Sequence, residues 1–255
     1  MKAIILAAGY ATRLRPLTDE VPKHLLPIGG RPMLDWILDK VVAVDQVDEV
    51  HLVTNSRFAG AFRNWAAGRD VAVHDDGTVS NEDRRGAIGD VEFTVEEAGL
   101  QGKDLLVIAG DNLFEYDLTD FVGFWAAKGE ASAVAVHDVR ERELASLYGV
   151  VDLDGADRVI GFVEKPADPP STLAATATYV YHREHAPLVR TYLEEGNSPD
   201  AIGNFIGWLH TRRSVYAYAF AGEWFDIGDH GQLLVADNRM RSLRGLPARD
   251  AYALS

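Results

Sequence analysis

The chain of 255 residues contains no cysteine, and none of its apolar runs is long enough to cross a membrane. Without cysteine there is no disulfide, no thiolate metal site and no cysteine nucleophile. A membrane-spanning helix needs roughly 18 apolar residues in a row, so we expect no membrane partner. The first apolar run is only about seven residues long and continues into charged sequence, which is typical of a strand and not of a signal peptide. We therefore expect a cytoplasmic protein.

Basic residues are also scarce. The chain has 25 lysines and arginines against 39 aspartates and glutamates, which gives a formal net charge of -14. Nucleic-acid binding requires a basic surface, because the phosphate backbone is anionic. We therefore expect no nucleic-acid partner. A free anionic small molecule can still bind where local cations and a metal ion outweigh the field of the whole protein.

Short apolar runs alternate with helical patterns along the whole chain. The predicted strands are 3–7, 49–54, 71–74, 104–109, 131–139, 150–153, 159–163, 176–181 and 215–220. The predicted helices are 32–44, 57–67, 91–98, 118–128, 184–195, 200–212 and 229–243. This alternation predicts an α/β protein with a mixed, mainly parallel sheet covered by helices on both faces. We expect a single domain over residues 1–255, with an insertion around residues 140–180 that carries substrate contacts.

The most informative segment is the turn that follows the first predicted strand. The apolar residues Ala3–Ala7 run into a small, glycine-bearing turn, Ala8–Thr12, and the cations Arg13, Arg15 and Lys23 follow it. Small residues at the end of a strand let a ligand approach the backbone closely, and free backbone N–H groups there bind anions. The pattern predicts a strongly negative ligand, and phosphate is the main candidate.

Two common phosphate-binding loops do not fit this turn. The dinucleotide fingerprint needs G-x-G-x-x-G before a helix and an acid about 20 residues later. Here Gly9 is the only glycine of the turn, and Pro16 blocks a long helix. The Walker A pattern is absent as well. A nicotinamide dehydrogenase is therefore disfavoured, and we expect a nucleotide loop of another kind.

The turn and five later segments resemble the signature of the sugar-1-phosphate nucleotidyltransferases, in particular the glucose-1-phosphate thymidylyltransferases and uridylyltransferases. The matching segments are LAAGYATRLRPLT (6–18), PKHLLPIGGRPM (22–33), Gly110–Asn112, Tyr148–Val151, Phe162–Pro166 and Trp224–Gly228. Together they cover nearly the whole chain in order. The resemblance implies a Rossmann-like three-layer sandwich of the nucleotide-diphospho-sugar transferase type. It also implies an enzyme that couples a nucleoside triphosphate to a sugar 1-phosphate and releases pyrophosphate.

Two aspartates follow strand-like segments far apart in the chain. Asp111 comes after the apolar run LLVIAG, and Asp226 comes after an aromatic run and before Gly228. Open α/β sheets bind ligands at the carboxyl ends of their strands, although either aspartate alone could be an ordinary turn residue. Mg²⁺ takes carboxylate oxygens together with phosphates and waters. The resemblance implies that Asp111 and Asp226 hold this ion.

The resemblance also implies roles for residues at the two substrate sites. Arg13 and Lys23 are the expected catalytic cations, with Arg13 on the triphosphate and Lys23 near its α-phosphate. The expected nucleotide-binding residues are Leu6, Ala7, Ala8, Gly9, Thr12, Asn81, Gly86 and Asp111. The expected residues for the sugar phosphate are Tyr148, Gly149, Glu164, Lys165 and Tyr179. Asn81 can offer an amide to a base edge, but it could also be a polar turn residue.

Departures from the family pattern leave the substrates open. Ala11 stands where the family usually has glycine, and His24 is an unusual neighbour for Lys23. The family's Arg-Gly-Glu motif is replaced by Gly196–Asp200, which contains no arginine. We expect dTTP or UTP with glucose 1-phosphate, and CTP stays open. The alternatives are a cytidylyltransferase acting on a phosphoalcohol or another phosphorylated small molecule, and a non-catalytic subunit that senses sugar nucleotides. Either a monomer or a homo-oligomer is compatible with the sequence.

Overall fold

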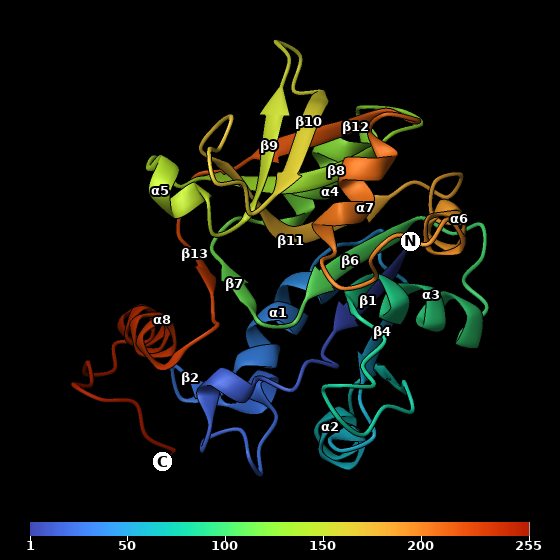
Figure 1. Ribbon diagram of the computed structural model, residues 1–255. Coiled ribbons are helices and arrows are strands. Elements are labelled where there is room, and N and C mark those ends of the chain that lie inside the picture. The colour runs from blue at the N-terminus through green and yellow to red at the C-terminus, as the bar shows by residue number, and fades with distance from the viewer. Residues whose placement is uncertain (255) are drawn as a thin grey trace.

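The computed structural model describes residues 1–254, which form a mixed sheet with helices on both faces (Figure 1). The strand order is β10-β9-β11-β6-β1-β4-β5, and β8 pairs with both β11 and β12. The sheet strands are β1 (Lys2–Leu6), β4 (Glu49–Thr54), β5 (Ala72–Asp75), β6 (Leu105–Ala109), β8 (Ser132–Asp138), β9 (Gly149–Leu153), β10 (Val159–Glu164), β11 (Leu173–Tyr181) and β12 (Val215–Ala219). The predicted α/β fold class is confirmed. Among residues 1–254 no helix is long and apolar enough to cross a bilayer.

Strand β1 lies at the centre of the parallel part of the sheet. It pairs in parallel with β4 and β6, and all five of its residues are buried. Because successive side chains of a strand point to opposite faces, Ile5 belongs to one apolar core and Ile4 to the other. The first core includes Phe62 and the second Val91, both from helices. The helices are α1 (Met33–Val42), α2 (Ala59–Ala66), α3 (Ala87–Glu97), α4 (Leu118–Ala126), α5 (Arg142–Ala145), α6 (Leu188–Glu194), α7 (Gly203–Leu209) and α8 (His230–Leu243).

Two short sheets lie outside the large one. β2 (Pro27–Ile28) pairs with β3 (Arg31–Pro32), and β7 (Asn112–Phe114) pairs with β13 (Trp224–Asp226), both antiparallel. Periodicity in the sequence predicts none of these strands, nor α5, because segments this short show no period. The pairing of β7 with β13 brings a late part of the chain against the turn that follows β6.

The predicted long elements agree with the structure except near their ends. Helix α3 begins at Ala87, four residues earlier than predicted, directly after Gly86 with its φ of 80°. Helices α6 and α7 are shorter than the predicted 184–195 and 200–212. Proline has no N–H and fits the start of a helix, and Pro187 directly precedes α6.

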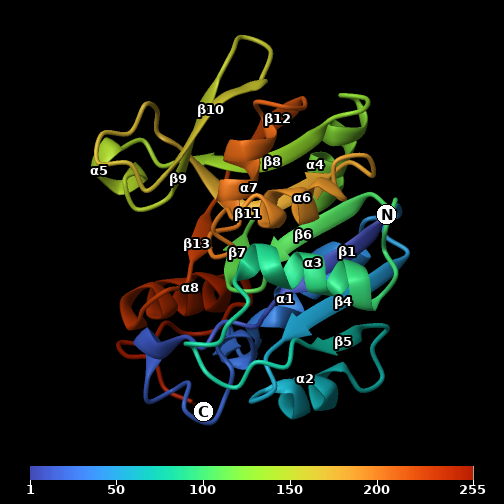
Figure 2. The ribbon, with the colours of Figure 1, turned by 45° about the vertical axis from the view of Figure 1, so that its right-hand side comes forward.

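The hairpin of β9 and β10 projects from the body of the molecule, with α5 beside it (Figures 1 and 2). These elements and β11 without its last residue lie in the segment 140–180, in which we expected substrate contacts. The hairpin pairs Gly149 with Glu164 at its base. Both residues therefore lie where the hairpin joins the large sheet.

Candidate active site

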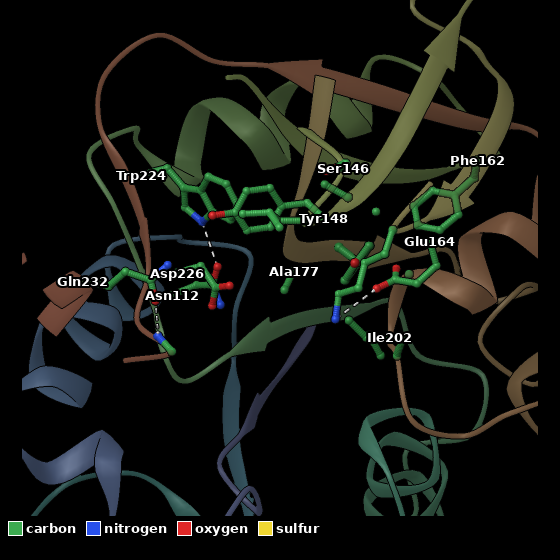
Figure 3. A pocket seen from close by; sticks show the side chains of 18 of the residues that line it. Asn112, Ser146, Tyr148, Phe162, Glu164, Ala177, Ile202, Trp224, Asp226 and Gln232 are labelled. Carbon is green, nitrogen blue, oxygen red and sulfur yellow. Dashed lines mark hydrogen bonds and ion pairs between the residues drawn. The ribbon is translucent and has the colours of Figure 1, made fainter. Parts of the chain in front are cut away.

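The carboxyl ends of β1 and β6 meet at one edge of the sheet. There the backbone N–H of Gly110 donates to the carbonyl of Leu6 over 2.8 Å. Two cavities open at this edge, one of about 580 Å³ (Figure 3) and one of about 260 Å³, and Ile202 lines both. Open α/β sheets bind ligands at the carboxyl ends of their strands, which makes this edge the candidate site.

The two cavities divide the predicted site residues between them. The smaller cavity is lined by Leu6, Ala8, Gly9, Lys23, Gly86 and Asp111. The larger cavity is lined by Arg13, Tyr148, Gly149, Glu164, Lys165, Tyr179 and Asp226. Leu6, Ala8, Gly9 and Gly86 in the smaller cavity are residues that we expected at the nucleotide. The residues that we expected at the sugar phosphate, from Tyr148 to Tyr179, all line the larger cavity. Ala7, Thr12 and Asn81 are not among the residues that line these two cavities.

The turn after β1 is held by contacts from outside it. Asn55 donates its side-chain N–H to the carbonyl of Ala8 (2.8 Å), and Thr18 donates its hydroxyl to the carbonyl of Ala11 (2.9 Å). Ala11 has a left-handed backbone with φ of 46°, which costs a non-glycine residue on the order of 1–3 kcal/mol. A Cβ added to Gly9 would meet no atom within 4 Å. The turn therefore leaves open space over its backbone, even with alanine at position 11.

Asp111 and Asp226 lie next to each other. Asp226 is paired with Asn112 across β13 and β7, and the N–H of Ile227 donates to the carbonyl of Asp111 (3.2 Å). Burial raises the pKa of Asp226 to about 6, and the Asp111 carboxylate adds to this shift. Burial also opposes ionisation of Asp111, but the Lys23 ammonium and the hydrogen bonds to this carboxylate outweigh it, so its pKa falls to about 2.

Lys23 is nearly buried beside this pair, on a short 3-10 turn that it starts. Its Nζ donates to Oδ2 of Asp111 (2.5 Å) and to the carbonyl of Ile227 (2.8 Å). The second carboxylate oxygen, Oδ1 of Asp111, accepts from the side-chain N–H of Asn112 (2.9 Å). A cation thus already lies among oxygens at this point of the site.

The same donors suit a divalent metal ion. Carboxylate and carbonyl oxygens are the ligands of hard cations such as Mg²⁺, which keeps waters and takes phosphate oxygens when few protein ligands are available. Among residues 1–254 no group of three or more His, Cys, Asp or Glu side chains could hold a metal. Asp111 and Asp226 therefore fit an ion that depends on substrate phosphates and water for its remaining ligands.

The end of β10 brings a carboxyl group and an ammonium group to the larger cavity. Glu164 points into the cavity in Figure 3, and its Oε1 lies 3.9 Å from Nζ of Lys165. The backbone N–H of Lys165 donates to the carbonyl of Tyr148 (3.0 Å), and Lys165 has a left-handed backbone with φ of 46°. Burial raises the pKa of Glu164. The left-handed backbone of Lys165 is strained for a residue other than glycine, and strained residues of this kind cluster at ligand sites.

Three glycines enclose the ring of Phe162 beside this cavity. A Cβ added at Gly149 or Gly203 would lie 2.5 or 2.4 Å from Cζ of Phe162, and one added at Gly207 would lie 3.0 Å from its Cδ1. Contacts this close are not found in real structures, so the ring fits only against glycine at the first two positions. The position of Phe162 is thus set from three directions.

An aromatic pair forms another wall of the larger cavity. The rings of Tyr148 and Trp224 meet edge to face, with centroids 4.8 Å apart (Figure 3). The indole N–H of Trp224 donates to Oδ1 of Asn112 (2.7 Å). The side-chain N–H of Asn112 in turn donates to the carboxylate of Asp111. We did not predict Trp224 or Asn112 as site residues, although both lie in segments that carry the family resemblance. Their hydrogen bond depends on the pairing of β7 with β13.

In the part of the chain that the structure describes, no arginine other than Arg13 lines the larger cavity, where the Arg-Gly-Glu cation would be expected. Among the described residues, the basic side chains that line the larger cavity are Arg13 and Lys165. A Cβ at Gly228 would lie 2.9 Å from Nη2 of Arg13, so glycine lets this guanidinium lie close to the backbone. The segment that stands in the place of the motif supplies Asp200 instead, which pairs with Arg84 (3.2 Å) at the smaller cavity.

Asn81, our candidate for reading the base, is exposed, and its carbonyl accepts a hydrogen bond from Arg84 (2.8 Å). The structure does not bring it to the smaller cavity. Asp90, on the first turn of α3, lines this cavity, and its buried Oδ1 has no hydrogen-bond partner. Burial and the neighbouring Asp76 raise the pKa of Asp90 to about 8. From the sequence alone, Asp90 looks like an ordinary acidic residue in a first helical turn.

The similarity of this chain to known proteins extends over most of its length. The family model of the nucleotidyl transferases matches residues 2–242. A bifunctional protein GlmU from Methanocaldococcus jannaschii is 30% identical over 241 residues, covering 93% of this chain and 53% of that protein. A UTP–glucose-1-phosphate uridylyltransferase from Synechocystis is 31% identical over 240 residues, covering 89% of this chain and 60% of that protein. The chain thus spans little more than half the length of these relatives.

A solved structure from Bacillus anthracis, assigned as a glucose-1-phosphate thymidylyltransferase in complex with a sucrose, has the same fold. It superposes with a TM-score of 0.79 at 25% identity, over 99% of this chain and 97% of that one. The match to the family model covers most of the chain. The chain belongs to the nucleotidyl transferase family.

Proposed function

We propose that this protein transfers a nucleotidyl group from a nucleoside triphosphate to a sugar 1-phosphate and releases pyrophosphate. One observation carries the proposal: Asp111 and Asp226 lie next to each other, and each lines one of two neighbouring cavities. Basic side chains accompany both, with Lys23 in the smaller cavity and Arg13 and Lys165 in the larger. A site of this kind can hold two anionic reactants close to each other.

The reaction we propose is an in-line displacement. A phosphate oxygen of the sugar 1-phosphate attacks the α-phosphorus of the nucleotide, and pyrophosphate leaves with the bonding electron pair. The attacking phosphate is already ionised, so the protein needs no base and no nucleophile. The work of the protein is to align two anions that repel each other and to neutralise their charge.

Each cation has a defined place in this scheme. Arg13 extends from the larger cavity toward the triphosphate of the nucleotide in the smaller one and stabilises the departing pyrophosphate. Lys23 contacts the α-phosphate, and Lys165 holds the incoming phosphate. Glu164 accepts hydrogen bonds from sugar hydroxyls in the larger cavity. Asp111 and Asp226 would hold Mg²⁺, which would neutralise the nucleotide phosphates.

We propose dTTP or UTP as the nucleotide and glucose 1-phosphate as the acceptor. The names of the similar proteins, a uridylyltransferase and a protein assigned as a thymidylyltransferase, support this choice. The small number of cations at the larger cavity favours one alternative, a cytidylyltransferase acting on a phosphoalcohol or another phosphorylated small molecule. A sugar-nucleotide-sensing subunit without activity is disfavoured, because the chain keeps Arg13, Lys23 and Lys165. A cytoplasmic location and a monomeric or homo-oligomeric state stay predictions.

The test is a matrix of pyrophosphate-release assays that combines the common nucleoside triphosphates with a panel of sugar 1-phosphates and phosphoalcohols. The proposal predicts release that needs both substrates and a divalent ion, with the highest kcat/KM for dTTP or UTP with glucose 1-phosphate. A preference for CTP with a phosphoalcohol would favour the cytidylyltransferase. No release with any pair would contradict transfer.

A further inference from the structure

We propose that, in the free protein, the ammonium of Lys23 occupies the position of the divalent ion, so that the ion binds only together with the nucleotide. The inference rests on the proposed nucleotidyl transfer but concerns a property of the protein without substrates. It gives Lys23 a second role besides contact with the α-phosphate.

The first support is the set of oxygens around Lys23. Its Nζ donates to Oδ2 of Asp111 (2.5 Å) and to the carbonyl of Ile227 (2.8 Å), and the residue is only 9% exposed. A carboxylate oxygen and a backbone carbonyl oxygen are also typical ligands of a hard divalent cation. The ammonium therefore has the surroundings of a bound metal ion.

The second support is that both carboxylate oxygens of Asp111 already accept hydrogen bonds. Oδ2 accepts from Lys23 and Oδ1 from Asn112 (2.9 Å). Mg²⁺ binds oxygen at about 2.0–2.1 Å, so an ion on Oδ2 would lie close to the ammonium that already bonds this oxygen. Two cations this close would also repel each other strongly in a partly buried site. The ion can therefore reach Asp111 only when Lys23 moves away.

The third support is the space into which Lys23 can move. Lys23 lines the smaller cavity together with Gly9 and Gly86, where we place the nucleotide. A flexible lysine stem can exchange a carboxylate for a phosphate oxygen at little cost, because both are anionic acceptors. The nucleotide would thus supply the new partner that lets Lys23 leave Asp111, and it would bring the ion with it.

The experiment measures Mn²⁺ binding to the protein without nucleotide, by calorimetry and by the electron paramagnetic resonance signal of free Mn²⁺. Lys23→Met removes the ammonium and keeps the length of the side chain. Lys165→Met is the matched control, because it removes one positive charge that also acts on Asp226 but makes no bond to Asp111. We expect Lys23→Met to bind Mn²⁺ at least tenfold more tightly than the wild type, and Lys165→Met to stay within about twofold to threefold of it.

Equal gains in both variants would overturn the proposal, because they would reflect net charge alone. No gain in a folded Lys23→Met protein would overturn it as well. The wild type gives an independent test. Its Mn²⁺ affinity in the presence of a non-hydrolysable nucleotide analogue should be at least tenfold higher than without the analogue. It should also exceed the Mn²⁺ affinity of the analogue alone in solution. Tight Mn²⁺ binding without nucleotide would overturn the proposal even if no variant folds. Failure of nucleotidyl transfer would instead appear only in the pyrophosphate assays.

Discussion

The indole N–H of Trp224 donates a 2.7 Å hydrogen bond to the side-chain oxygen of Asn112, 112 residues earlier in the chain. Asn112 in turn donates to Oδ1 of Asp111 (2.9 Å). The orientation of the Asp111 carboxylate therefore depends on a residue of the late strand β13. Groups that orient a metal ligand in this way typically contribute tenfold to hundredfold to metal affinity or activity.

Replacing Trp224 by Phe should keep an aromatic wall against Tyr148 but leave Asn112 without this donor. We expect kcat/KM to fall by about tenfold to hundredfold and the Mg²⁺ concentration for half-maximal rate to rise. The control is Trp125→Phe, which removes an indole hydrogen bond to the carbonyl of Ala131 (2.7 Å), away from both cavities. Unchanged metal dependence in Trp224→Phe would show that the Asn112 contact does not position the ligand.

Arg13→Ala should lower turnover by a factor of hundreds. Loss of one charge-assisted contact to developing negative charge typically costs about 2.7–4 kcal/mol of transition-state stabilisation. Arg15 is the matched control, since it is exposed, pairs with Asp19 (3.3 Å) and lines neither cavity. Steady-state kinetics of both variants decide the matter, and an Arg13→Ala enzyme as fast as Arg15→Ala would remove Arg13 from the mechanism.

Gly149→Ala should destabilise the protein and weaken acceptor binding. The new Cβ would lie 2.5 Å from Cζ of Phe162 and 2.9 Å from Oε2 of Glu164, and overpacking of this kind typically costs about 1–3 kcal/mol. Gly123→Ala, inside α4 with no atom within 4 Å of its Cβ, should be neutral or stabilising by about 0.5–1 kcal/mol. Thermal unfolding and the KM for the acceptor measure both effects. A Gly149→Ala protein that melts and binds like Gly123→Ala would contradict this packing.

Asp90 should make the folded protein less stable as the pH rises. Its pKa is raised to about 8 in the folded protein, whereas an unfolded aspartate ionises near pH ~4. Between these values the folded state holds a proton that the unfolded state lacks, so the free energy of unfolding falls with pH by up to ~1.4 kcal/mol per unit. Asp90→Asn cannot ionise and should flatten this slope in urea unfolding between pH 5 and 8. The exposed Asp45→Asn serves as control, and equal slopes in the two variants would refute the assignment.

The central part of the fold follows from patterns that are local in the sequence. A strand buried on both faces is a nearly continuous apolar run, so β1 and β6 could be predicted almost to the residue. Strands β7 and β13 could not, because each has only three residues and depends on the other for its pairing. The hydrogen bond between Trp224 and Asn112 was beyond prediction for the same reason.

At the candidate site, too, features with a local signal in the sequence could be predicted, and those that depend on distant segments could not. The turn at Gly9 could be predicted, because small residues and cations at the end of a strand carry a local signal, whereas Lys165 was expected at the site only through the family resemblance. Asn81 and Asp90 depend on how the loop before α3 folds, and the loop leaves Asn81 exposed and places Asp90 at the smaller cavity. The contact between Lys23 and Asp111 joins residues 88 positions apart and has no signature in either segment.

The most direct test of the account is pyrophosphate release by the wild type and by Asp226→Asn, with dTTP or UTP, glucose 1-phosphate and Mg²⁺. We predict turnover by the wild type and a loss of at least about 100-fold in the variant, which exceeds the usual effect of an indirect contact, with an unchanged circular dichroism spectrum. A folded Asp226→Asn enzyme that releases pyrophosphate at the wild-type rate would contradict the account.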